Sequence, residues 1–138
     1  MSDKKTKVVI CIPTVTRPWQ QTLDSIAASI PLLDEAGYEH FMVTEIGNPY
    51  ISMARAMMLR KALDVKADII VFIDHDISWQ PKDLLNLIQT DGDVVAGIYR
   101  FKQDGEVKYM GVIEDDPISH LPIVRADGAL KATRVPAG

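Results

Sequence analysis

Asp68-Ile69-Ile70-Val71-Phe72-Ile73-Asp74-His75-Asp76 joins an unbroken apolar run to a short acidic motif. An apolar run of this length, rich in β-branched residues, is typical of a strand buried on both faces of a sheet. A second run of the same kind, Val8-Val9-Ile10-Cys11-Ile12, ends at Pro13. We predict a central parallel strand over residues 8–12 and another buried strand over residues 68–73.

Helical patterns alternate with the strand-like runs. Apolar residues recur at spacings of three and four between Pro18 and Gly37, again over residues 51–65, and again from Pro81 onward. Further strand-like runs lie at 40–46 and 94–99. This alternation implies crossover connections, so we predict an α/β fold with a mostly parallel sheet flanked by helices.

The last third of the sequence has a different pattern. Asp104-Gly105 and Asp127-Gly128 each separate two strand-like runs, and aspartate-glycine in that position is a hairpin signal. We therefore predict antiparallel strands in the C-terminal third. The chain stops at residues 135–138 without a closing helix, and we expect the natural protein to continue.

The composition is that of one globular domain. The 138 residues carry 15 Lys and Arg against 19 Asp and Glu, a net charge of −4, with no run of like charges to follow a phosphate backbone. We therefore expect no nucleic acid partner. No apolar stretch spans a membrane and no leader pattern is present, so we expect a cytoplasmic protein without a transmembrane segment. The single cysteine, Cys11, is expected to pack as a small hydrophobe.

Asp74 and Asp76 follow a predicted strand at the position where open α/β sheets bind ligands. In an extended backbone, residues i and i+2 point to the same side of the strand. Both carboxylates would then face one point and offer the hard oxygen ligands that Mg²⁺ and Mn²⁺ prefer. The alternative is that one carboxylate caps the following turn and the other is solvated. His75 would point away from the pair, and its role is left open by this geometry.

With these motifs in order, the chain resembles the nucleotide-sugar-binding half of GT-A-fold glycosyltransferases, particularly those of family 2. Four pieces carry the resemblance: the strand that leads into Pro13-Thr14 and Arg17, Glu45 at the end of a second strand, Ala54-Arg55, and Asp74-His75-Asp76, which is similar to the DxD signature. One piece departs from the family pattern. Where the family has a D-D-x-S-like run, this chain has Thr44-Glu45-Ile46-Gly47-Asn48.

The resemblance implies a fold, a reaction and a set of roles. It implies a GT-A fold, with residues 1–138 as a single nucleotide-sugar-binding domain that lacks the C-terminal acceptor part. The implied reaction is metal-dependent transfer of a sugar from a nucleotide-diphosphate donor to an unknown acceptor. The implied donor-binding residues are Pro13, Thr14, Arg17, Glu45, Arg55, Asp74 and His75, with Glu45 at the base. Asp74 and Asp76 would hold the Mn²⁺ or Mg²⁺ that bridges the diphosphate.

We assign no catalytic residue from the sequence. In the family that the chain resembles, the acceptor half, with the catalytic base of inverting members, lies downstream of a small-residue strand start like Pro136-Ala137-Gly138, and this sequence ends there. The acidic run at 114–116, before Pro117, is typical of a solvated turn. Arg17, Arg55 and Arg100 are candidates for positive charge beside the leaving diphosphate.

Two other functions fit parts of the pattern. An apolar strand followed by Asp-x-Asp also fits the nucleophile and acid pair of haloacid-dehalogenase-type phosphatases and phosphotransferases. Here the pair lies in mid-chain, with Ser78 two residues after the second aspartate. The third hypothesis is a non-catalytic fragment that binds a nucleotide sugar, since the acceptor half is missing.

Overall fold

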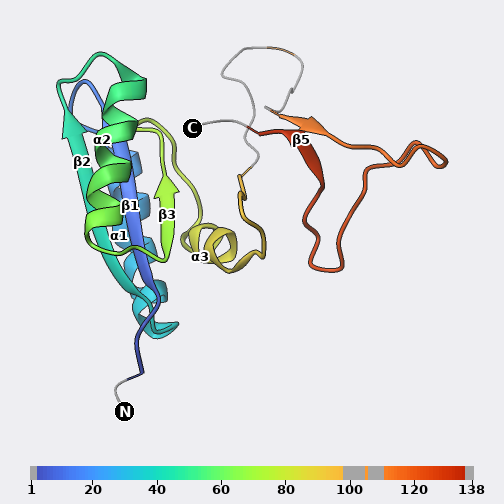
Figure 1. Cartoon of the computed structure of the whole chain (residues 1–138), viewed down its shortest axis with the longest axis horizontal. Helices are drawn as coiled ribbons and strands as arrows, with labels where there is room; N and C mark the ends of the chain where they lie inside the picture. Colours follow the sequence, from blue (N-terminus) through green and yellow to red (C-terminus); the bar gives the residue numbers. More distant parts are fainter. Residues whose placement is uncertain (1–2, 98–104, 106–110, 136–138) are drawn as a thin grey trace. The chain divides into compact units, whose positions relative to one another are not determined.

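The structure, a computed structural model, describes residues 3–97, 105 and 111–135. The chain divides into two compact units, one formed by residues up to 88 and one by residues 89–137 (Figure 1). Within the described residues, none of the helices has the length and apolar character needed to cross a membrane.

The first unit is a parallel sheet flanked by helices. In chain order its elements are β1 (Lys7–Thr14), α1 (Gln20–Glu35), β2 (Glu39–Ile46), α2 (Ile51–Asp64), β3 (Ile69–Phe72) and α3 (Pro81–Gln89). The three strands lie in the order β2-β1-β3, and both pairings are parallel. The predicted α/β class and the central position of residues 8–12 are confirmed.

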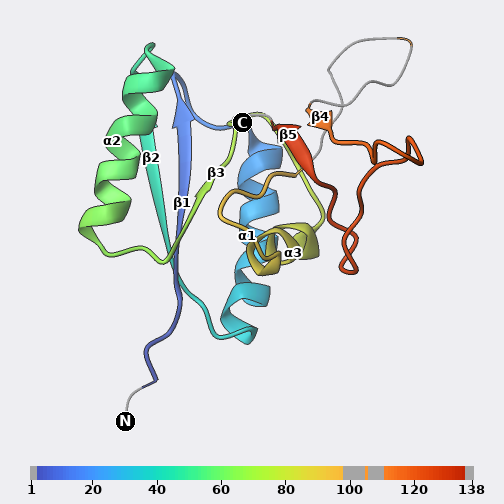
Figure 2. The ribbon, with the colours of Figure 1, turned by 45° about the vertical axis from the view of Figure 1, so that its right-hand side comes forward.

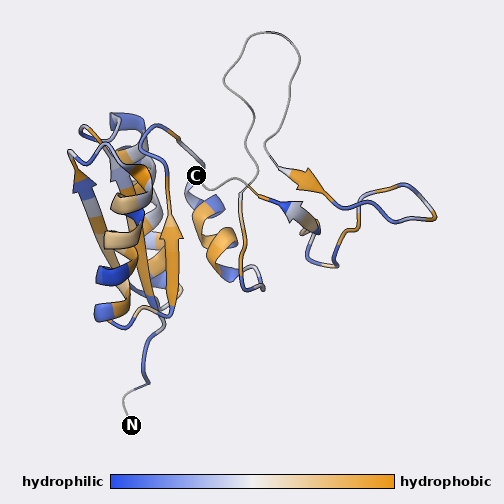
Figure 3. Cartoon of the chain, turned by 45° about the horizontal axis from the view of Figure 1, so that its top comes forward, coloured by the Kyte–Doolittle hydropathy of each residue, from blue (hydrophilic) through white to orange (hydrophobic). Residues whose placement is uncertain are grey.

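β1 is central because both of its faces are apolar. Val8, Ile10 and Ile12 belong to one core, which they share with side chains of α1 and α3. Val9 and Cys11 belong to the other core, which they share with side chains of α2. Figure 2 shows α2 on one side of the sheet and α1 with α3 on the other. The apolar character of β3 along its length is visible in Figure 3.

The helix boundaries follow local sequence signals. α1 is followed by Gly37, whose φ of +84° lies in the left-handed region that favours glycine. Pro81 is the first residue of α3, a position at which its missing N–H removes no helical hydrogen bond. Both signals were part of the prediction, and both helices are confirmed.

In the second unit, β4 (Val112–Ile113) pairs antiparallel with β5 (Ala132–Arg134). The predicted turn at Asp127-Gly128 is present. The N–H of Gly128 donates to the carbonyl of Arg125, and the N–H of Arg125 donates to the carbonyl of Ala129. Antiparallel strands in the C-terminal third are therefore confirmed.

Two elements predicted in the first part of the second unit are not confirmed. The hairpin expected around Asp104-Gly105 lies outside the described residues, apart from Gly105 itself. Of the strand expected over 94–99, residues 94–97 are described and belong to no strand. The Val94 side chain is 80% exposed. β-branched residues favour a strand only where neighbouring residues pack against them. The sequence pattern therefore overestimated the tendency of residues 94–97 to form a strand.

Candidate functional site

Three of the predicted site residues lie at the carboxyl edge of the parallel sheet. Thr14 is the last residue of β1, Glu45 precedes the last residue of β2, and Asp74 lies two residues beyond β3. The carboxyl ends of parallel strands share one edge, and open α/β sheets bind ligands just outside it. The topology therefore brings these residues to the expected edge.

The acidic motif lies in a turn and not in an extended strand. β3 ends at Phe72, the N–H of Ile73 still donates to the carbonyl of Cys11 at 2.9 Å, and His75 and Asp76 form a turn. The expected alternation of residues i and i+2 is therefore wrong for this pair, because it requires extended backbone. That Asp74 and Asp76 jointly bind a metal stays a prediction, supported by their chemistry and not by strand geometry.

Arg55, near the start of α2, faces Asp74. Its Nη2 lies 3.7 Å from Oδ1 of Asp74, and the two side chains are 28% and 30% exposed. The Nε of Arg55 is buried and has no hydrogen-bond partner. A guanidinium is suited to bind anionic oxygens, and the Arg55 side chain is partly exposed. The structure thus pairs two predicted site residues from different elements.

Three buried hydroxyls of α1 face the segment after β3. Thr22, Ser25 and Ser29, called the hydroxyl row below, are all at most 8% exposed. The Thr22 Oγ1 lies 2.7 Å from the carbonyl oxygen of Ile77 and 3.0 Å from that of His75. The turn that carries the acidic motif is therefore held on α1 by side-chain hydrogen bonds.

Sequence reasoning overlooked the hydroxyl row. Its members share a helix stripe with Ile26 and Leu33, which are buried in the core. Hydroxyls within an apolar stripe must find hydrogen-bond partners when the stripe is buried, and this was the available signal. The partners of Thr22 lie 53 and 55 residues along the chain, so helical periodicity had no means of identifying them.

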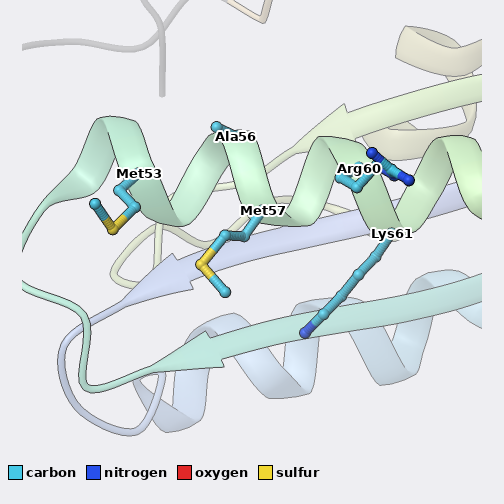
Figure 4. A pocket seen from close by; sticks show the side chains of 5 residues that line it. All are labelled: Met53, Ala56, Met57, Arg60 and Lys61. Atoms are coloured by element: carbon cyan, nitrogen blue, oxygen red, sulfur yellow. The ribbon is translucent and has the colours of Figure 1, made fainter.

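Glu45 forms an ion pair with a side chain of α2. Its carboxylate forms an ion pair with the Lys61 ammonium, and Figure 4 shows the Lys61 side chain extended from α2 toward β2. A role for Glu45 in recognising a nucleotide base stays a prediction.

The residues predicted at the end of β1 differ in exposure. Pro13 and Thr14 are buried, and the Thr14 hydroxyl donates to the carbonyl of Thr16 in the following loop. Arg17 is exposed in that loop. Arg100 lies outside the described residues. The donor-binding roles of Pro13, Thr14 and Arg17 stay predictions.

The oxygen donors of Asp74 and Asp76 suit a hard divalent cation. Among the residues that the structure describes, no group of three or more His, Cys, Asp or Glu side chains is placed to hold a metal ion. Mg²⁺ commonly binds through one or two carboxylates and takes its other ligands from water and substrate phosphates. The residues present therefore fit a cation that arrives with a diphosphate.

The acidic run at 114–116 lies before a turn at residues 117–119 of the second unit, which the His120 N–H closes by donating to the carbonyl of Asp116 at 2.9 Å, whereas Asp115 is bridged antiparallel to Pro122. The Lys131 Nζ lies 3.2 Å from Oε1 of Glu114. The Asp116 Oδ1 accepts the backbone N–H groups of Ser119 and Ile118 at 2.7 Å and 2.9 Å. These hydrogen bonds hold the pKa of Asp116 below its ordinary value, and the bond from Ser119 has the larger effect on the pKa. The predicted turn is present only from Asp116 onward, and the carboxylates of Glu114 and Asp116 have local structural partners.

A hollow lies along the outer side of α2, lined by Met53, Ala56, Met57, Arg60 and Lys61 (Figure 4). None of the predicted site residues lines it. The hollow therefore shares no residue with the candidate site at the edge that carries Asp74.

Comparisons with models of known protein families, with curated proteins and with solved structures found no match to this chain. The residues and contacts described above are therefore the basis for assigning a function.

Proposed function

We propose that this chain is the donor-binding part of a metal-dependent glycosyltransferase with a GT-A-type fold, acting in the cytoplasm on a nucleotide-diphosphate sugar. The contact between Arg55 and Asp74 carries the proposal. These residues come from two of the motifs on which the resemblance rests. Their approach at the carboxyl edge of a parallel sheet supports a common role in binding one ligand.

The reaction would break the bond between the anomeric carbon of the sugar and the diphosphate oxygen. The electron pair of that bond leaves with the nucleoside diphosphate, while an acceptor oxygen forms the new bond and gives up its proton. Negative charge therefore grows on the diphosphate as the bond breaks. A bound Mg²⁺ or Mn²⁺ would supply most of the compensating charge.

Residues of this chain would hold and orient the diphosphate. Asp74 and Asp76 would bind the cation, and Arg55 would donate to a phosphate oxygen from its guanidinium. A protein with a net charge of −4 has little general positive potential to offer, so these local groups must neutralise the donor. The residue that accepts the acceptor's proton is not assigned.

Ligand-induced stabilisation tests the proposal directly. The melting temperature is measured with UDP, GDP, CDP and ADP, each with Mn²⁺ and each with EDTA. At a hundredfold excess over Kd, a bound ligand adds about 2.7 kcal/mol, or roughly 5–15 °C for a chain of this size. We expect a shift with at least one diphosphate that requires Mn²⁺. The absence of a shift with all four contradicts the proposal.

Two further measurements separate the alternatives. Slow hydrolysis of a nucleotide sugar, which needs no acceptor, is expected of a glycosyltransferase domain, whereas binding without turnover favours a non-catalytic binding fragment. Formation of a phosphoryl-aspartate at Asp74 favours the haloacid-dehalogenase-type chemistry instead.

A further inference from the structure

We infer that Thr22 is a positioning residue, which acts through the turn at residues 74–77 to set the direction of the Asp74 and Asp76 carboxylates. The inference rests on the proposed function, because it assumes that these carboxylates bind a cation with a diphosphate. No motif in the sequence marks Thr22, and its role follows from its contacts alone.

Thr22 is placed to control the turn because its hydroxyl reaches both sides of Asp76. The side chain is fully buried, and Oγ1 lies 3.0 Å from the carbonyl oxygen of His75 and 2.7 Å from that of Ile77. One hydroxyl proton is shared between the two carbonyls as a bifurcated donor. The backbone on each side of Asp76 is thereby tied to a single atom of α1.

The same carbonyl of His75 accepts a second hydrogen bond from the start of α1. The backbone N–H of Trp19, the residue before the helix, donates to it at 2.9 Å. The first N–H groups of a helix have no partner within the helix, so this bond satisfies one donor at the helix start while holding the turn. Removal of the Thr22 hydroxyl would leave His75 with this bond and Ile77 without its side-chain partner.

The rest of the hydroxyl row fixes the far end of the segment. The Ser25 Oγ accepts the backbone N–H of Trp79 at 3.2 Å, and the Ser29 Oγ accepts the indole N–H of Trp79 at 3.0 Å. The Ser29 hydroxyl in turn donates to the carbonyl of Ser25 at 2.7 Å. The segment from 75 to 79 is thus held at both ends. Within the hydroxyl row, Thr22 is the member that contacts the two residues flanking Asp76, His75 and Ile77.

Such a link matters because ligands of a cation must be oriented as well as present. Outer-shell partners that orient metal ligands typically change metal affinity by about 10- to 100-fold when they are removed. The carboxylates here come from a turn, which is intrinsically less rigid than a strand. Bonds from a helix therefore supply the rigidity that the backbone of the turn does not.

The test compares Thr22→Val, which removes the hydroxyl at nearly constant shape, with Thr22→Ser, which keeps it. Ile26→Val is the matched control, because Ile26 is buried on the same helix and makes no hydrogen bond to the turn through its apolar side chain. Two quantities are measured on folded protein: amide hydrogen exchange over residues 74–79 without ligand, and Kd for Mn²⁺ with the nucleoside diphosphate that gives the largest melting shift.

We expect Thr22→Val to accelerate exchange over residues 74–79 and to raise Kd by about tenfold or more, while Thr22→Ser and Ile26→Val stay within about threefold of the wild type. Unchanged exchange in Thr22→Val overturns the inference whatever the ligand does. Faster exchange with unchanged Kd also overturns it, because the turn would then be held without consequence for binding. A wild-type protein that binds none of the four diphosphates refutes the proposed function, while exchange still reports whether Thr22 holds the turn.

Discussion

Arg55 of α2 and Asp74 of the turn after β3 form an ion pair at the carboxyl edge of the sheet, with Nη2 3.7 Å from Oδ1. This separation exceeds that of a hydrogen bond, so the contact balances charge without locking the guanidinium in a bidentate fork. The two partly exposed charges therefore contribute little to stability.

Replacement of Arg55 by alanine should weaken diphosphate binding and leave the fold intact. A hydrogen bond to a charged group is worth about 1.5–3 kcal/mol, so Kd in the presence of Mn²⁺ should rise by roughly 10- to 100-fold. Arg60→Ala is the matched control, because Arg60 lies on the same helix, carries the same charge and pairs with Asp64 on the surface. Calorimetric titration measures both variants. Equal losses of affinity would mean that Arg55 acts only through net charge.

Replacement of Asp76 by asparagine should abolish the part of binding that depends on the metal. The amide keeps the shape of the side chain but loses the negative charge that a hard cation requires. We expect the Mn²⁺-dependent rise in melting temperature to disappear in Asp76→Asn and in Asp74→Asn. Asp64→Asn, an exposed change on α2, should retain it. Metal-dependent binding that survives in Asp76→Asn would remove this residue from the cation site.

The sheet and its helices were predictable because their signals are local. The unbroken apolar runs at 8–12 and 68–73 predict strands buried on both faces. β1 has that character, whereas β3 packs against both cores but only Val71 of its four residues is buried. The apolar spacing of α1 and the Asp127-Gly128 turn depend likewise on a few neighbouring residues. Such patterns determine which face of an element is buried, and hence the fold class.

The site was only partly predictable because its contacts are not local. The aspartates at 74 and 76 indicated the chemistry of the site. Their backbone lies in a turn and not in a strand, and hydrogen bonds from Trp19 and Thr22 to the carbonyl of His75 hold that turn. No spacing within the acidic motif contains that information. The prediction of a strand over residues 94–97 was wrong for a related reason, because apolar β-branched residues form a strand only beside a partner strand or a packed face.

The core around β1 should be sensitive to loss of volume on α1. Leu33 is fully buried in the core shared by β1 and α1, so Leu33→Ala should destabilise the protein by about 2–5 kcal/mol. Leu63→Ala is the control, because Leu63 lies near the end of α2 and is 57% exposed. Its cost should be below about 1 kcal/mol. Urea unfolding followed by circular dichroism measures both, and similar costs would contradict the assigned core.

The Cys11 thiol should make stability fall at high pH. Burial raises its pKa from 9.0 to about 11, so in the range between these values the unfolded chain releases the thiol proton while the native protein keeps it. Stability is therefore retained below pH 9 and lost as the pH rises toward 11. Between pH 8 and pH 10 the loss from this one group is about 1 kcal/mol. Other groups titrate in the same range, so urea unfolding of the wild type is compared with Cys11→Ala at both pH values. The wild type should lose about 1 kcal/mol more than the variant, and equal losses would mean that the thiol is not shielded from solvent.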